Sequence, residues 1–428
     1  MREILTIEVG QAGIQLGNAI WEQYCAEHAI DNGGKRKENA VKDDCFKVFF
    51  EETCSGQFVD LEPNVIDDVK NGPFAAIFNH EFLVHGKEDA ANNFARGHYT
   101  IGKQIIDKVN DRLRKLVDSC DNVMGFIIGH SVGGGTGSGL GALILKHLTV
   151  DYKKPKIGLE IYPSPNLSTC VVEPYNALLA TQWLLDHTDI SLLLDNEAIY
   201  GICQKQLRIA KPDLNNLNKL ISKVISSMTA SLRFRGELNV DLSGLQTNLI
   251  PFPRLHFMTT GMSPIIPKVD VSTAPNDVQK ITDDCFNPAN WFVKYTEFDP
   301  TEDKYVTIYL NYRGNITSKE ANATVQWLKS NNKVALVEWC PTSFKIGLNN
   351  VPTVTLESDD IGAFSKNAVM IANNMGISRV FSKRIIQKYD LMYSQRAFVH
   401  WYLGEGMEEG EFDEAREDLG FLEKYYLD

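Results

Sequence analysis

The sequence predicts an α/β protein built on a doubly wound parallel sheet, followed by a second, smaller mixed α/β domain. Three observations support this fold class. Short apolar runs alternate with helical patterns over the first two hundred residues, a long apolar stripe at helical spacing follows, and prolines then precede further strands. With 428 residues and 43% hydrophobic content, the chain can bury a core in each layer.

Four apolar runs of strand length predict the buried strands of the first domain. They cover residues 4–9, 124–128, 157–162 and 190–194. Between them, residues 101–116 carry Ile, Val and Leu at helical spacing, which predicts a helix. Strands that alternate with helices pair in parallel, so we expect five such units to form one domain.

Residues 214–232 predict a long core helix, because their apolar residues recur in steps of three and four and form one broad stripe. The helix follows the sheet domain and precedes a turn-rich segment. We therefore expect it to bridge two domains and to contact both.

The remaining chain predicts a mixed domain and a helical end. Five prolines between residues 251 and 275 indicate loops, and strands are expected at 305–312, 334–339 and 344–348. A helix at 379–393 and an exposed acidic helix at 408–426 predict a C-terminal helical hairpin. The expected domains are 1–196, 197–372 with the bridging helix, and 373–428.

Composition excludes several classes of function. The 43 Lys and Arg against 55 Asp and Glu give a net charge of -12, which argues against nucleic-acid binding and favours basic partner surfaces. No apolar run reaches the ~18 residues that span a bilayer, and no secretory signal opens the chain. We therefore expect a cytoplasmic protein that does not bind a membrane.

The cysteines and histidines indicate no metal cluster. The eight cysteines are scattered without CxxC spacing, so we expect free, mostly buried thiols, with a single reactive thiol as the alternative. Five histidines far apart in sequence are expected to be packed in the core: His85, His98, His130, His256 and His400.

The strongest motif is a glycine run at residues 133–139, Gly-Gly-Gly-Thr-Gly-Ser-Gly, between the strand ending at 128 and the helical pattern at 140–145. Glycines let backbone N–H groups turn toward an anion, and the following helix adds partial positive charge. This predicts a phosphate-binding loop that is neither the Walker loop nor the dinucleotide fingerprint. The alternative is a flexible glycine-rich turn.

A second strand-to-loop junction, residues 10–13 (Gly-Gln-Ala-Gly), reaches the same carboxyl edge of the sheet. Further polar segments at 60–63, 86–93 and 172–176 are expected to join it. Carboxylates near phosphates indicate Mg²⁺, with Asp60 or Glu62 binding it through water.

These motifs resemble tubulin along the whole chain, and the α subunit more closely than the β subunit. The family signature is the glycine run, and segments 2–4, 60–63, 239–242 and 397–402 match as well. The resemblance to α subunits rests on residues 339–345, the longer loop 354–365 and residues 404–412.

The resemblance implies a GTP site with Mg²⁺. It places at the phosphates Gly10, Gln11, Ala12, Asp89, Ala90, Asn92, Ser131, Gly134, Gly135, Thr136 and Gly137. The ribose and guanine would meet Thr169, Glu173, Asn196, Leu214 and Asn218, and the metal would lie near Asp60 and Glu62.

The chain departs from the family at three points. Leu214 stands where tubulins stack a tyrosine on guanine, so an aromatic contact is lost. Gly244 stands where α subunits carry the glutamate that positions the attacking water, although Asp241 persists nearby. The sequence ends at residue 428 without the usual Glu-rich tail, which leaves two alternatives: the protein lacks the modifications of such a tail, or the sequence is a truncated piece of a longer chain.

The resemblance implies a GTP-binding structural subunit of a microtubule-like polymer in the cytoskeleton. An α-like chain would pair with a β-like subunit, stack head to tail and activate its neighbour's GTP hydrolysis poorly, unless Glu237 or the backbone compensates for Gly244. Lateral contacts would use the loop 259–278, and motor and microtubule-associated proteins would dock on acidic residues 405–417. The alternative is a self-assembling homopolymeric GTPase. A metabolic α/β enzyme has little support, because no nucleophile, base and orienter set is found.

Overall fold

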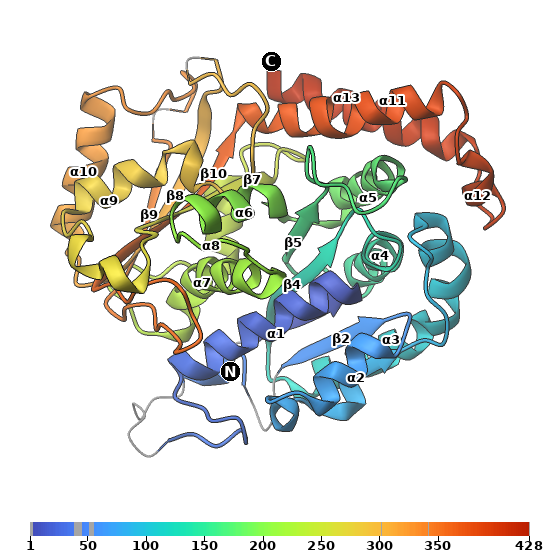
Figure 1. The fold of residues 1–428 in the computed structure, drawn as a ribbon, viewed down its shortest axis with the longest axis horizontal. Coiled ribbons are helices and arrows are strands. Elements are labelled where there is room, and N and C mark those ends of the chain that lie inside the picture. Colours follow the sequence, from blue (N-terminus) through green and yellow to red (C-terminus); the bar gives the residue numbers. More distant parts are fainter. Residues whose placement is uncertain (1–2, 38–44, 51–54, 301, 341, 428) are drawn as a thin grey trace.

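A single ten-stranded sheet runs through the computed structural model, which describes residues 3–37, 45–50, 55–300, 302–340 and 342–427. The strand order is β3-β2-β1-β4-β5-β6-β7-β10-β8-β9 (Figure 1). The strands are β1 Glu3–Val9, β2 Gly56–Asp60, β3 Leu83–His85, β4 Val123–Ser131, β5 Lys156–Tyr162, β6 Ile190–Asp195, β7 Phe257–Ser263, β8 Tyr305–Gly314, β9 Phe344–Asn349 and β10 Lys366–Asn374.

The first six strands pair in parallel, as the alternation of strands and helices predicts. Strand β7 pairs in parallel with β6 over two residue pairs, Ser191 with Phe257 and Leu192 with Met258. Strand β10 then pairs antiparallel with both β7 and β8, and β9 closes the edge in parallel with β8. The doubly wound fold class is confirmed, and the later strands continue the same sheet.

Helices cover both faces of the sheet. The α-helices are α1 Gly10–Glu27, α2 Asn64–Asn71, α3 Ile101–Ser119, α4 Gly141–Asp151, α5 Glu173–His187, α6 Asn196–Lys205, α7 Leu214–Arg233, α8 Leu242–Leu249, α9 Val278–Cys285, α10 Ser318–Ser330, α11 Gln387–Tyr393, α12 Val399–Leu403 and α13 Gly410–Leu427. The described residues also form three π-helical segments, η4 Arg96–Thr100, η5 Thr136–Leu140 and η9 Val380–Ile386.

Two hydrophobic clusters lie on opposite faces of the sheet because successive side chains of each strand point to opposite sides. One contains apolar residues of α3, α4, α5, α9, α11 and α13, and the other those of α1, α2, α6, α7 and α8. Helix α7 contacts α1 and α6, which belong to the N-terminal half of the chain, and also strands β7 to β10, which belong to the C-terminal half. The predicted bridging role is therefore confirmed.

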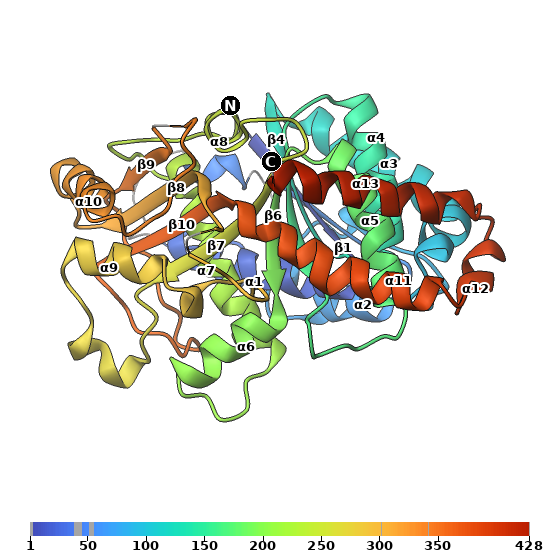
Figure 2. The same cartoon turned by 90° about the horizontal axis from the view of Figure 1, so that it is seen from above.

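The C-terminal hairpin is also confirmed. The expected helix at 379–393 consists of η9 followed by α11, and α13 packs beside it in both views (Figure 2). Helix α13 buries Phe412, Leu419 and Leu422, and its acidic residues lie mainly on the outer side.

One predicted strand is wrong. Residues 334–339 form only an isolated bridge between Leu336 and Tyr305, because β9 occupies the edge of β8 from Ile308 onward. The strands β2, β3, β7 and β10 were not predicted.

The cysteines and histidines differ in part from expectation. All described cysteines are free, but only Cys25, Cys203 and Cys285 are buried, and the other described thiols are partly exposed; Cys54 lies outside the described residues. Histidines 98, 130 and 256 are core residues, whereas His85 is partly exposed and His400 is exposed. In the described part of the chain, no helix is long and apolar enough to cross a membrane.

Candidate functional site

A cavity of about 560 Å³ lies at the carboxyl edge of the parallel strands. The carboxyl ends of β1, β4 and β5 and the amino ends of α1 and α6 border it, at Val9, Ser131, Tyr162, Gly10 and Asn196. The edge where parallel strands end is the usual place for a ligand in this class of sheet. The sequence predicted this position.

Most of the predicted site residues line this one cavity. They are Gly10, Gln11, Ala12, Asp60, Glu62, Asp89, Asn92, Ser131, Gly134, Gly135, Thr136, Gly137, Thr169, Glu173, Asn196 and Leu214.

Two predicted residues do not line the cavity. Ala90 is fully buried behind the glycine run, where a Cβ added to Gly135 would lie 2.8 Å from its own Cβ. Asn218 is buried on α7, one helical turn after Leu214. Neither side chain forms part of the cavity wall.

Several lining residues were not predicted, and the most informative is Tyr200. It lies on α6 four residues after Asn196, so both face the cavity from the same side of the helix. The i, i+4 spacing from Asn196 is the signal that could have found it. Tyr200 gives this end of the cavity an aromatic ring although Leu214 does not.

The glycine run forms the floor of the cavity and is tightly packed. A Cβ on Gly137 would lie 2.5 Å from the carbonyl oxygen of Ser131, and one on Gly135 would lie 2.7 Å from the amide nitrogen of Asn93. A Cβ on Gly134 would meet no atom within 4 Å, so this residue faces open space. Gly134 therefore lets a ligand approach the backbone closely.

The run does not lead directly into an α-helix. Residues Thr136–Leu140 form the buried π-helical segment η5, and α4 begins only at Gly141. Helix α1 does start at the cavity, and its N-cap Val9 provides no side-chain bond and its first turn has no acidic residue. Free N–H groups and the helix dipole at that end favour an anion.

Three carboxylates gather at the phosphate side of the cavity. Burial raises the pKa of Asp60 to about 7, and the charges of Glu62 and Asp89 also raise it, while a bond from the Leu61 amide at 2.7 Å lowers it. In the described part of the chain no Lys or Arg forms an ion pair with these three carboxylates. A divalent cation would relieve their repulsion, so the residues fit Mg²⁺.

The chain by itself does not complete a metal site. Among the described residues, no group of three or more His, Cys, Asp or Glu side chains has an arrangement that could hold an ion. Mg²⁺ would therefore take its remaining oxygen ligands from phosphates and water, as it commonly does.

Glu173 organises the opposite wall of the cavity. Its Oε1 accepts hydrogen bonds from the Thr169 amide at 3.0 Å, the Thr169 hydroxyl at 2.8 Å and the Cys170 amide at 3.1 Å. Its Oε2 accepts one from the Ser168 hydroxyl at 3.1 Å. The buried carboxylate thus fixes the loop that carries Thr169.

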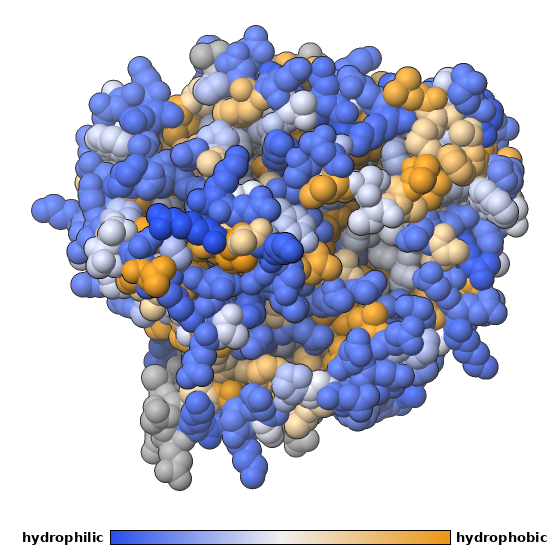
Figure 3. All heavy atoms as spheres, viewed as in Figure 1, coloured by the Kyte–Doolittle hydropathy of each residue, from blue (hydrophilic) through white to orange (hydrophobic). Residues whose placement is uncertain are grey.

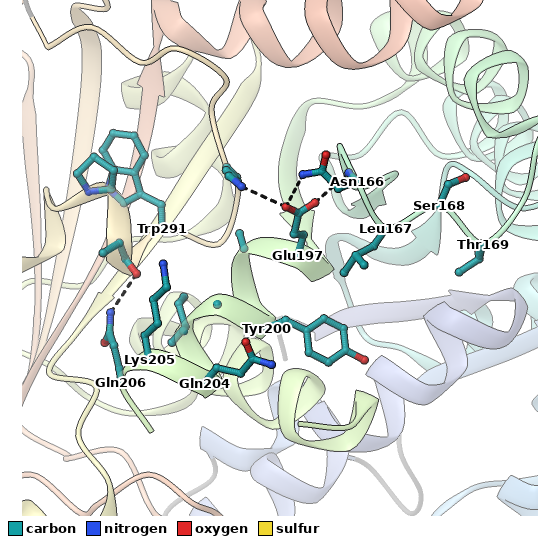
Figure 4. Close-up of a pocket in the computed structure, with 16 residues that line it drawn as sticks. Asn166, Leu167, Ser168, Thr169, Glu197, Tyr200, Gln204, Lys205, Gln206 and Trp291 are labelled. Atoms are coloured by element: carbon teal, nitrogen blue, oxygen red, sulfur yellow. Dashed lines mark hydrogen bonds and ion pairs between the residues drawn. The ribbon is translucent and has the colours of Figure 1, made fainter. Parts of the chain in front are cut away.

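A larger cavity of about 910 Å³ adjoins the first and shares Leu167, Thr169 and Tyr200 with it (Figure 4). Its carboxylate, Glu197, is already bonded to Asn166 at 2.9 Å and to Lys294 at 3.1 Å. The larger cavity is lined neither by the glycine run nor by Asp60, Glu62 and Asp89. Although it is larger, it is therefore not the candidate phosphate site.

Comparison with known families indicates which phosphate-containing ligand this cavity binds. Residues 3–204 match the GTPase domain of the Tubulin/FtsZ family, and residues 253–386 match the tubulin C-terminal domain. The chain belongs to the tubulin family. Tubulins with this GTPase domain bind GTP, and this chain is a GTP-binding, tubulin-like polymer subunit of the cytoskeleton.

Proposed function

We propose that this tubulin is α-like, holds GTP with Mg²⁺ in the 560 Å³ cavity, and pairs with a β-like subunit to assemble head to tail. We further propose that it activates GTP hydrolysis in the neighbouring subunit poorly. The observation that carries the second proposal is Gly244 at the start of α8.

The cavity supports a division of the GTP site into two ends. The glycine run, the start of α1 and the loop at Asp89 would hold the phosphates, and Asp60 and Glu62 would hold Mg²⁺. When bound, Mg²⁺ would neutralise phosphate charge. Thr169 would face the ribose, and Asn196 with Leu214 and Tyr200 would face the guanine. Asn218 would reach the base only if its buried side chain turned, so we assign it a supporting role.

The side chains around Gly244 do not replace the missing carboxylate. Asp241 is the N-cap of α8, and its Oδ1 accepts a hydrogen bond from the Gly244 amide at 2.7 Å. That carboxylate is therefore committed to the start of the helix. Glu237 is exposed in the preceding loop, four residues before the cap. Positioning of water is nearly all that phosphoryl transfer asks of a protein, so its loss should slow hydrolysis.

Restoring the glutamate tests this proposal. In polymer assembled with a β-like partner, Gly244→Glu should raise phosphate release about tenfold or more, since a positioned carboxylate is worth at least that in catalysis. Gly244→Ala is the matched control, because any Cβ here lies 2.9 Å from Asp241 Oδ1, and Gly244→Gln adds length without charge. Equal release by wild type and Gly244→Glu would contradict the proposal.

The same assay addresses the homopolymer alternative. The chain is incubated with GTP in the absence of any partner, and polymer mass and phosphate are followed together. Polymer with phosphate release from the chain alone would favour a self-assembling GTPase over an α-like subunit.

The proposed contact surfaces are narrower than the sequence indicated. Residues Phe257–Ser263 form the buried strand β7, so the lateral loop cannot begin at 259, and only residues 264–278 remain for that role. On the acidic face, Glu405 pairs with Arg96 at 3.1 Å and Glu411 accepts from the Tyr99 hydroxyl. Glu409 is exposed but pairs with Arg396 at 3.0 Å. The other exposed carboxylates of this face, which we propose for motors and associated proteins, are Glu408, Asp413, Glu414 and Glu417.

A further inference from the structure

The side chain of Asn176, on the first turn of α5, uses its whole hydrogen-bonding capacity within a fully buried site. Its Nδ2 donates to the carbonyl oxygen of Asn92 at 2.7 Å and to that of Gly133 at 2.9 Å. Its Oδ1 accepts from the Phe94 amide at 3.0 Å and from the Tyr402 hydroxyl at 2.7 Å. One amide thus joins two loops of the GTP cavity and a segment near the C-terminus.

The loop that it holds is strained. Ala91 has a φ of 50° and Asn92 a φ of 54°, so two consecutive residues with side chains lie in the left-handed region. Such a conformation persists only where neighbouring groups hold it. The bond from Asn176 to the Asn92 carbonyl does so, and Arg96 adds a bond from its Nε to the Asp89 carbonyl at 3.1 Å.

Tyr402, the partner of Asn176 near the C-terminus, lies on a segment with an exposed surface. Residues 397–405 include Phe398 and Trp401, which are 40% and 62% exposed. Apolar side chains also gather on the surface at the upper right of Figure 3, where the C-terminal hairpin lies in Figure 1. Two further bonds tie this segment to the same region. Asn93 Nδ2 donates to the Trp401 carbonyl at 3.0 Å, and the Tyr175 hydroxyl donates to the Ala397 carbonyl at 2.8 Å.

We propose that Asn176 is a positioning residue for GTP, which fixes the loop 89–93 against the glycine run and couples that arrangement to the surface segment 397–405. The inference rests on the proposed assignment of the cavity as the GTP site. Coupling of this kind is reciprocal: if the nucleotide favours one arrangement of the loop, that arrangement favours one conformation of the segment.

Two variants of the full chain test the proposal. Asn176→Asp tests the positioning of the loop 89–93 for GTP, and Tyr402→Phe tests the coupling to the segment 397–405. Asn176→Asp keeps the accepting oxygen but sets a carboxylate oxygen against two carbonyls, so affinity for a fluorescent GTP analogue should fall about tenfold or more. Tyr402→Phe removes only the hydroxyl. It should abolish the difference in amide hydrogen exchange of residues 397–405 between the GTP-bound and GDP-bound states, which wild type should show.

Tyr312→Phe is the matched control, because it removes a buried hydroxyl on β8 that bonds the Thr282 hydroxyl of α9 at 2.9 Å, away from the GTP cavity and the loop 89–93. It should change neither readout. Unchanged GTP affinity in Asn176→Asp, or an unchanged exchange difference in Tyr402→Phe, would overturn the proposal while the GTP site stands. Absence of GTP binding by wild type would instead reject the cavity assignment.

Discussion

Glu8, near the end of β1, is a buried carboxyl group held in space left by two glycines. A Cβ on Gly17 of α1 would lie 2.5 Å from Glu8 Cγ, and one on Gly129 of β4 would lie 2.0 Å from Glu8 Oε2. That Oε2 has no hydrogen-bond partner among the described residues. Burial therefore raises the pKa of Glu8 to about 8, and the group stays protonated at neutral pH.

Glu8→Gln should change the pH dependence of stability. The unfolded chain loses the Glu8 proton above about pH 4.5, whereas the folded chain keeps it until about pH 8. Stability from the buried neutral group is thus complete below the unfolded pKa and is lost as pH rises through the folded pKa. Gln cannot ionise, so the melting temperature of the variant relative to wild type should be higher at pH 8 than at pH 5 by about 3 °C.

Thermal melts of both proteins at the two pH values provide the measurement. Glu160 has its pKa raised to about 8 by burial as well, but it is present in both proteins and cancels in the difference. A difference between variant and wild type that is the same at pH 5 and pH 8 would rule out a protonated Glu8.

At this scale the sequence predicted which residues have an unusual backbone or a polar side chain at the sheet edge. The glycine run, Asp60 and Glu173 were found in this way, and all line the cavity. The role of Asn176 was not found, because it depends on Tyr402 and Asn92, which come close only when distant segments pack. Ala90 and Asn218 do not line the cavity because other elements bury them, and their contacts with the nucleotide stay predictions.

At the scale of elements, the π-helical segments η4 and η5 pack backbone against backbone. A Cβ on Gly97 would lie 2.4 Å from the Gly135 carbonyl oxygen, and one on Gly139 would lie 2.3 Å from the Phe94 carbonyl oxygen. Gly135, Gly137 and Gly139 are therefore needed for packing. Gly134 is the remaining glycine of the run after Gly133, and it alone of these residues faces open space. The density of the run reflects two requirements, close contact between segments and access for a ligand.

Gly139→Ala should push η4 and η5 apart, because the new Cβ would clash with the Phe94 carbonyl oxygen, a backbone atom that cannot rotate away. We expect a loss of about 2 kcal/mol or more in stability, typical of an overpacked core, together with weaker GTP binding. Gly201→Ala on α6 is the control, since a Cβ there meets nothing within 4 Å and should stabilise the helix by about 0.5 to 1 kcal/mol. Melting curves of both variants measure this, and a Gly139→Ala protein as stable as wild type would contradict it.

The strands that were missed carry polar residues inside the sheet. Strand β7 includes Thr259, Thr260 and Gly261, and β10 ends with Asn373 and Asn374, all buried. The Nδ2 of Asn373 donates to the Leu255 carbonyl at 2.8 Å, a partner that the local pattern does not reveal. Buried strands with such partners do not form continuous apolar runs. The domain boundaries at residues 196 and 372 stay a prediction.

At the scale of the whole molecule, a buried ionic cluster joins α1, α7 and β8. Glu27 pairs with Arg233 at 2.7 Å and with Arg313 at 3.1 Å, and all three side chains are fully buried. The Ser226 hydroxyl also donates to Glu27 at 2.7 Å. Burial alone would raise the pKa of Glu27, but Arg313 and Arg233 outweigh it and hold the pKa well below its usual range.

Arg313→Met should cost about 3 to 5 kcal/mol, because it leaves part of a buried charge unpaired. The double variant Glu27→Gln with Arg313→Met should lose less than the sum of the single losses, since the two side chains interact. Arg416→Met removes a partly exposed pair with Asp390 at 2.8 Å and should cost under about 1 kcal/mol. Urea unfolding of wild type and of the four variants, with Glu27→Gln also measured alone, provides the values, and strictly additive losses would contradict a coupled cluster.

The junction between β6 and β7 has a mechanical consequence. Only two residue pairs connect these strands, whereas β10 pairs with β8 along nearly its whole length. Because so few pairs connect them, we expect a bending force on this sheet to deform it at the line between β6 and β7. Helix α7 contacts elements on both sides of that line and would resist such bending. The ion pairs of Glu27 with Arg233 and Arg313 fasten the C-terminal end of α7 to α1 and β8.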